Sequence, residues 1–162
     1  MHLKEVMDYL ESKGSEQTRK IYIKHGAQEP FFGVKVGDMK PIEKKEKNNH
    51  KLALELYATK NGDAQYLAGL IANPNEFKKE DLMLWAREAT WYMVSEYAVA
   101  WNLAENDNCL EVALEFIQSD DPKLQVVGWS GMSSFLLIKN SEGLNVNVVE
   151  ELLEKTENEL HG

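Results

Sequence analysis

An internal repeat at an offset of 60 residues constrains the fold of this chain more than any other feature. The pentapeptide LALEL at 52–56 returns as VALEF at 112–116. Further matches at the same offset are Gln65, Leu67 and Ala68 with Gln125, Val127 and Gly128. Each copy comprises a helix, a polar turn and a second, more apolar helix. Because such a hairpin buries its apolar face only against a neighbour, the repeat predicts a stack of helical hairpins.

Helical spacing of apolar residues extends over nearly the whole chain. The i, i+3, i+4, i+7 pattern is clearest in two sets, Leu3, Val6, Met7 and Leu10, and Leu110, Ala113, Leu114 and Ile117. Gly14 is expected to end the first helix, and Ser15 to cap a second helix that extends to about His25. A helix pair is expected over 79–105 and a last helix over 149–156. No period-2 alternation is long enough to predict a strand.

These patterns predict one domain over residues 1–162, all-α in class. The expected architecture is an α-α superhelix of about ten helices, stacked as antiparallel pairs in the manner of HEAT-like repeats. Punctuation by polar turns, such as Asn61-Gly62-Asp63 and Asp120-Asp121-Pro122, marks where the paired helices meet.

Charge is distributed unevenly along the chain. The formal charge is −9, but residues 1–80 hold 14 Lys and Arg against 12 Asp and Glu, whereas residues 81–162 hold 4 against 15. This balance excludes strong nonspecific binding to nucleic acid, and any anion-binding surface has to come mainly from the first half. The densest basic run includes Lys35, Lys40 and Lys44, which could contact phosphates or form an ordinary solvated helix face.

Several classes of protein are disfavoured by composition. The single cysteine, Cys109, excludes an internal disulfide and suggests a reducing compartment. The N-terminus lacks an apolar signal core, and the longest mostly apolar stretch, 126–138, is too short to span a bilayer. The four histidines lack the spacing of a helical metal site, so neither a metal nor a cofactor is expected. We therefore expect a cytoplasmic protein without a membrane anchor.

Three segments resemble one family. FFGVKVGDMKPIEKK at 31–45, HKLALELYATKNGDAQYLAGLIA at 50–72 and a following tryptophan-centred helix resemble the AlkD-like DNA alkylation repair glycosylases. The resemblance implies HEAT-like repeats and, in active members, excision of N3- or N7-alkylated purines from duplex DNA. The chain is expected to lack the last helices of that family.

The matching catalytic positions depart from the family pattern. Its Trp-Asp-x-x-Asp motif corresponds to residues 91–95, where Trp91 is retained but Tyr92 and Ser95 replace both carboxylates. The resemblance makes Ser95 the counterpart of the catalytic acid, and a neutral hydroxyl cannot stabilise a developing cation as a carboxylate does. Glu96 follows directly, but one residue along an α-helix is a rotation of about 100°, which directs it to another face.

A second departure concerns the cation of the family site. The family's arginine falls at about Val126, with Lys123 nearly one turn earlier. The candidate catalytic residues are therefore Ser95 and Glu96. The candidate DNA-binding residues are Trp91, Tyr92, Lys35, Lys40, Lys44 and Lys123. The other tryptophans, Trp85, Trp101 and Trp129, are expected to pack within or between repeats.

Two functions remain open from sequence. The first is a member of the alkylation-repair family that binds duplex DNA weakly, with glycosylase activity reduced or lost. The alternative is a non-catalytic α-solenoid scaffold that binds a protein or peptide on its concave face. Clustered lysines in the groove would favour DNA, whereas glutamates and exposed aromatic residues would favour protein. The sequence leaves the oligomeric state open.

Overall fold

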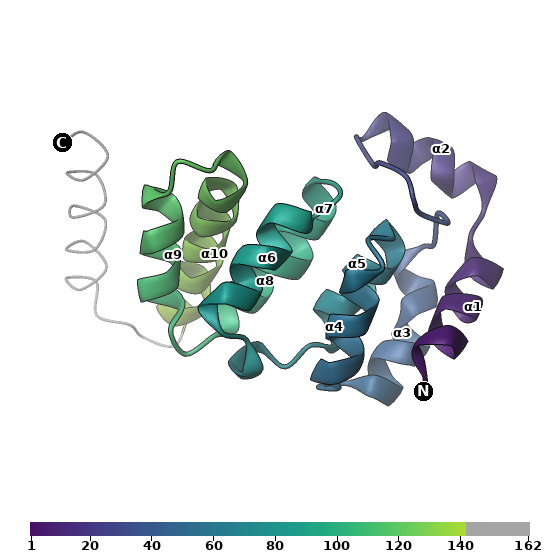
Figure 1. Cartoon of the computed structure of the whole chain (residues 1–162), viewed down its shortest axis with the longest axis horizontal. Helices are drawn as coiled ribbons and strands as arrows, with labels where there is room; N and C mark the ends of the chain where they lie inside the picture. The colour runs from purple at the N-terminus through teal and green to yellow at the C-terminus, as the bar shows by residue number, and fades with distance from the viewer. Residues whose placement is uncertain (142–162) are drawn as a thin grey trace.

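The computed structural model describes residues 1–141, and every regular element within that range is helical (Figure 1). The α-helices are α1 Leu3–Lys13, α2 Glu16–Lys24, α3 Val36–Glu46, α4 His50–Ala58, α5 Gly62–Ile71, α6 Lys79–Glu88, α7 Tyr92–Val94, α8 Ala100–Glu105, α9 Cys109–Gln118 and α10 Pro122–Ser141. A 3-10 turn, η1, spans Pro74–Glu76, and a π turn, η2, spans Ser95–Val99. The all-α prediction is confirmed, while the helix predicted over 149–156 lies outside the described residues.

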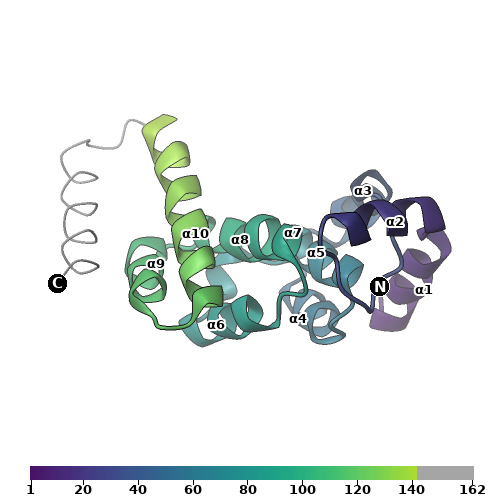
Figure 2. The same ribbon diagram turned by 90° about the horizontal axis from the view of Figure 1, so that it is seen from above.

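The helices stack in two layers. Figure 2 shows α3, α7 and α8 toward one side of the array and α4 and α6 toward the other. Helix α4 packs against α5 and α9 packs against α10, so the two copies of the sequence repeat are the two hairpins that the repeat predicts. The segment between them supplies α6 and the run α7–η2–α8, as expected for 79–105.

Polar side chains in the turns cap the starts of helices, as the sequence indicates. The Ser15 hydroxyl accepts a hydrogen bond from the Thr18 N–H and caps α2. The Asn61 side chain accepts from the N–H groups of Asp63 and Ala64 at the start of α5, at 3.0 and 3.1 Å. These bonds satisfy amide groups that have no partner inside the helix, which fixes the point where each helix starts.

One continuous apolar core extends through the array. Its largest fully buried side chains include Trp85, Tyr57, Phe116, Leu67 and Leu103. Trp85 stacks on Tyr57 with ring centroids 4.0 Å apart and planes 4° from parallel. The prediction that Trp85 is a packing residue is therefore confirmed, and Cys109 is likewise a buried small side chain.

The run of residues 92–105 crosses α5 at very short range. A Cβ atom at Gly69 would overlap the Cβ and Cα atoms of Ala98, so the two backbones touch. The buried Asn102 amide donates to the carbonyl oxygens of Gly69, at 3.0 Å, and Ala98, at 2.7 Å. Close packing and buried hydrogen bonds thus hold the helix against α5.

The crossing predicts a strong effect of one methyl group. Gly69→Ala should lower the free energy of unfolding by about 1–3 kcal/mol, because the added atom forces α5 and the π turn apart. Gly37→Ala is the matched control, since Gly37 lies within α3 with no atom within 4 Å of its added Cβ. That variant should be unchanged or more stable by about 0.5–1 kcal/mol. Urea unfolding followed by circular dichroism measures both, and equal stabilities would contradict the prediction.

Candidate nucleic-acid interface

The helix that carries the candidate site is not a regular α-helix. Trp91 precedes it in an extended conformation, and the run continues through α7, the π turn and α8 without a break. The Ala100 N–H bonds to the Ser95 carbonyl oxygen five residues earlier, which is the π-helical pattern. The sequence interpretation assumed α-helical rotation here, whereas the rotation beyond Ser95 is that of a π turn.

Trp91 is packed rather than open. Its ring lies 5.1 Å from the ring of Tyr22 and 5.5 Å from that of Tyr92, measured between centroids. The Tyr22 hydroxyl donates to the Val34 carbonyl oxygen at 2.7 Å, which holds the ring in place. The cavity beside Trp91 measures about 20 Å³. This volume holds about one water molecule, so this cavity is too small for a DNA base.

A buried glutamine braces the turn that leads to Trp91. The Gln65 side chain is fully buried, donates to the Glu88 carbonyl oxygen at 2.8 Å and accepts from the N–H and hydroxyl groups of Thr90. Its repeat counterpart, Gln125, donates to the Ser119 carbonyl oxygen at 2.6 Å. Both copies of the repeated glutamine therefore brace a helix–helix turn, a role that the sequence match alone did not reveal.

A buried carboxylate holds the loop over 31–34, within the first family segment. Asp63 accepts hydrogen bonds from the N–H groups of Phe32, Gly33 and Val34, the last two at 3.1 and 3.0 Å. Burial raises the pKa of Asp63, while these bonds and the nearby Arg19 oppose that rise. The sequence marked Asp63 only as a turn residue. Its bonding partners lie about 30 residues earlier in the chain, so no local pattern indicated this role.

Ser95 and Glu96 lie in different surroundings. Ser95 is half-buried at the start of the π turn. Glu96 lines a cleft of about 410 Å³ between this helix and α10, together with Tyr97, Trp101, Trp129, Ser130, Ser133 and Ser134. Nothing in the geometry tests a catalytic role for either residue, so these assignments remain predictions.

Two tryptophans expected in the core are exposed. The side chains of Tyr97, Trp101 and Trp129 are 51%, 45% and 42% exposed and face the cleft between helix 92–105 and α10. The packing expectation was wrong for Trp101 and Trp129, because the apolar spacing of a helix does not show which face a neighbouring helix covers. Tyr97 was not singled out from sequence.

The predicted lysines do not form one patch. Lys35, Lys40 and Lys44 are exposed on or beside α3 and form no ion pair with any residue of 1–141. Lys123 lies at the start of α10, toward the opposite end of the array (Figure 1). Its ammonium group donates to the Arg87 carbonyl oxygen at 3.1 Å, which links α10 to the end of α6.

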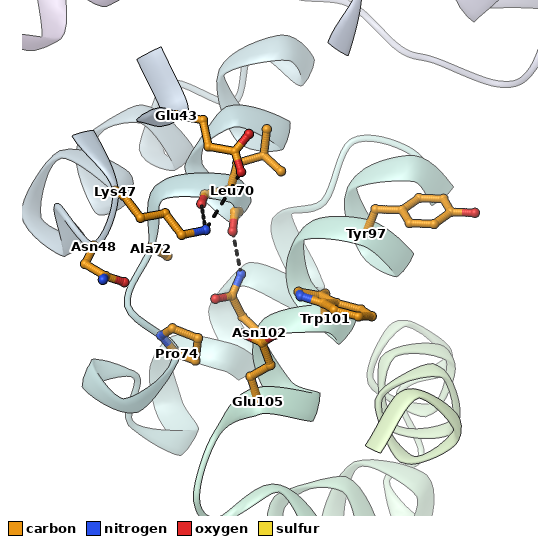
Figure 3. Close-up of a pocket in the computed structure, with 11 residues that line it drawn as sticks. Glu43, Lys47, Asn48, Leu70, Ala72, Pro74, Tyr97, Trp101, Asn102 and Glu105 are labelled. Carbon is orange, nitrogen blue, oxygen red and sulfur yellow. Dashed lines mark hydrogen bonds and ion pairs between the residues drawn. The ribbon is translucent and has the colours of Figure 1, made fainter. Parts of the chain in front are cut away.

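A second groove adjoins the aromatic cleft. It measures about 170 Å³ and is lined by residues that include Glu43, Lys47, Tyr97, Trp101 and Glu105 (Figure 3). The Lys47 ammonium donates to the Leu70 carbonyl oxygen at 3.0 Å and lies 3.8 Å from a Glu43 carboxylate oxygen. Both grooves are thus acidic and aromatic in character, and the free lysines lie elsewhere.

Comparison with known proteins identifies the family. A sequence model described as DNA alkylation repair enzyme matches residues 6–161. This chain belongs to the DNA alkylation repair enzyme family. The chain is also similar to proteins of Listeria innocua serovar 6a and Listeria monocytogenes serovar 1/2a, named uncharacterized proteins Lin0241 and Lmo0209. Each is 32% identical over 126 residues, which cover 74% of this chain and 56% of the relative. The chain therefore spans little more than half the length of these relatives.

A solved structure confirms the repeat architecture. It is 42% identical to this chain, with a TM-score of 0.86, and the match covers 98% of this chain and 67% of that one. That protein is described as one of a new family related to the HEAT-like repeat DNA glycosylases, with affinity for branched DNA structures. The HEAT-like fold and the family predicted from sequence are both confirmed.

No group of three or more His, Cys, Asp or Glu side chains that could hold a metal ion occurs within residues 1–141. None of the helices in that range combines the length and apolar character that crossing a bilayer requires.

The anchoring role of Asp63 predicts a local loss of order in Asp63→Asn. Backbone donors at 32–34 would lose a full acceptor, which costs about 1–3 kcal/mol of stability, although removal of the buried charge recovers part of this. Amide hydrogen exchange at residues 32–34 should accelerate more than exchange in α9. Asp8→Asn, on the exposed face of α1, is the control and should leave both regions unchanged. Unaltered exchange at 32–34 would show that other contacts hold this loop.

Proposed function

We propose that this protein binds branched DNA and excises alkylated bases slowly or not at all. The observation that carries the proposal is the neutral Ser95 at the position where the family places its catalytic carboxylate. Cleavage of a glycosidic bond leaves positive charge on the sugar, and a hydroxyl provides little stabilisation for that charge.

The surroundings of Trp91 support reduced excision. Tyr22 packs on its ring and the adjoining cavity holds only about 20 Å³. An alkylated purine therefore has no ready place against this tryptophan. The arginine of the family site is also replaced, since Val126 is an exposed apolar residue on α10.

Binding to branched DNA is supported by the structural relative and by charge. The relative with affinity for branched DNA matches nearly the full length of this chain. The net charge of −9 weakens attraction to any long linear duplex, so recognition has to depend on shape and on a few local contacts. The ammonium groups of Lys35, Lys40 and Lys44, which form no ion pair with residues 1–141, are available for such phosphate contacts.

Excision should be slow in the unmodified protein. We expect release of N7- or N3-alkylated purines from methylated duplex DNA to be roughly 10²–10³-fold slower than for a family member with the carboxylate. Ser95→Asp should recover a small part of that rate. Chromatography of released bases measures both. Efficient release by the unmodified protein that is abolished by Glu96→Gln and unaffected by Ser95→Ala would instead assign the chemistry to Glu96.

Binding should favour a four-way junction over a linear duplex of equal length and should be lost by physiological salt. For two to four lysine contacts, the log–log dependence of the association constant on salt should have a slope of about −2 to −4. Lys40→Gln with Lys44→Gln should reduce that slope by about 2. Gel-shift titrations across a salt series provide the measurement.

A control double variant with the same change in net charge tests whether the α3 lysines contact DNA directly. Lys4→Gln with Lys13→Gln removes the same charge from α1 and should leave the slope unchanged. An equal loss in both double variants would contradict a role for the α3 lysines. Equal affinity for the junction and the linear duplex would contradict the preference for branched DNA.

A further inference from the structure

The cleft between helix 92–105 and α10 surrounds one carboxylate with exposed aromatic rings. Glu96, Tyr97 and Trp101 come from the first helix, and Trp129 comes from α10. Ser130, Ser133 and Ser134 share one face of α10 at i, i+3 and i+4 and add hydroxyl groups to its wall. DNA binding by the α3 lysines leaves this cleft without a role.

The π turn brings Glu96 and Trp101 to the same face. In a regular α-helix, residues five apart are separated by about 140° around the axis. The bond from the Ala100 N–H to the Ser95 carbonyl oxygen closes a turn over five residues instead of four. Trp101 therefore lies approximately one turn above Glu96, which explains why both line the cleft. Figure 3 shows the rings of Tyr97 and Trp101 directed away from Glu43 and Lys47.

The Glu96 carboxylate lacks a partner within the described residues. The side chain is half-buried, yet it forms neither a hydrogen bond nor an ion pair with any residue of 1–141. A carboxylate partly withdrawn from water is unfavourable unless a donor or a cation compensates for the lost hydration. The cleft thus presents an acceptor that suits a positively charged ligand.

The charges around the cleft have the same sign. The adjoining groove shares Tyr97 and Trp101 with the cleft and adds the carboxylates of Glu43 and Glu105. Among the described residues that line either space, the one cation is Lys47, which is already held by Glu43 and the Leu70 carbonyl. Three carboxylates against one lysine repel phosphate and attract a cation.

We propose that this cleft docks an arginine-bearing segment of a partner protein. A guanidinium group is planar, stacks on indole rings and forks two hydrogen bonds to a carboxylate. Trp101 or Trp129 provides the ring, and the Glu96 carboxylate accepts the two hydrogen bonds of the guanidinium group. The serine hydroxyls of α10 exchange hydrogen bonds with the partner's backbone. The site is separate from the α3 lysines, so it adds a protein-binding surface to a DNA-binding protein.

The test uses the full chain and a capped peptide of glycine and serine that contains two arginines. A peptide with glutamine in place of both arginines is the first control, and a single strand of eight thymidines is the second probe. Isothermal titration calorimetry should show binding of the arginine peptide at least about 10-fold tighter than the glutamine peptide. Glu96→Gln and Trp129→Ala should each weaken binding about 3- to 10-fold.

Matched variants test whether the effect belongs to the cleft. Glu80→Gln and Leu84→Ala remove an exposed carboxylate and an exposed apolar side chain from α6 and should leave peptide binding unchanged. Affinity for the four-way junction is measured on the same cleft variants. Cleft variants that bind the peptide more weakly but bind the junction as before would support two separate surfaces. If the unmodified protein does not bind the junction at all, the proposed DNA binding fails, but the peptide result still tests the cleft.

Three outcomes would overturn the proposal. Equal or undetectable binding of the two peptides would show that the arginines are not recognised. Tighter binding of the oligonucleotide, lost in Trp129→Ala, would make the cleft a nucleic-acid site. Self-association that disappears in Trp129→Ala during sedimentation would make its occupant a second copy of the chain.

Discussion

The contact between the backbones of α5 and the π turn is the constraint on which the rest of the site depends. Gly69 has no side chain at the crossing, so helix 92–105 approaches α5 closely and Asn102 can bond to carbonyl groups on both sides. With one face of the helix pressed against α5, its larger side chains project from the remaining faces. Tyr97 and Trp101 consequently reach the cleft beside α10.

Much of the fold could be predicted from sequence because its signals are local or periodic. The repeat at 52–56 and 112–116 placed both hairpins, and residues such as Gly14 and Ser15 marked helix ends through their own backbone and side-chain chemistry. The π turn was not predictable in this way, because apolar spacing assumes a constant rotation per residue. The exposure of Trp129 was also unpredictable, since it depends on how far α10 is covered by helices distant in sequence.

Along the helix that follows Trp91, a residue of the family motif is retained at the start, whereas the open cleft lies further along. At its start, Trp91 retains the family's aromatic identity but packs against Tyr22. Further along, exposed rings and Glu96, which has no partner among residues 1–141, form an open cleft. Identity of a residue at a matching position therefore did not establish an open site. The sequence singled out this helix as the candidate site, whereas its accessible surface depends on side chains contributed by Tyr22 and α10.

The π turn also has an evolutionary consequence. Since one of its turns contains an additional residue, it is equivalent to a single-residue insertion in an ancestral α-helix. Loss of one residue between Tyr97 and Ala100 would leave Trp101 four residues after Glu96, a spacing that keeps both on one face of a regular α-helix. A relative with a one-residue gap at this point would therefore carry the counterparts of Glu96 and Trp101 on one face without a π turn.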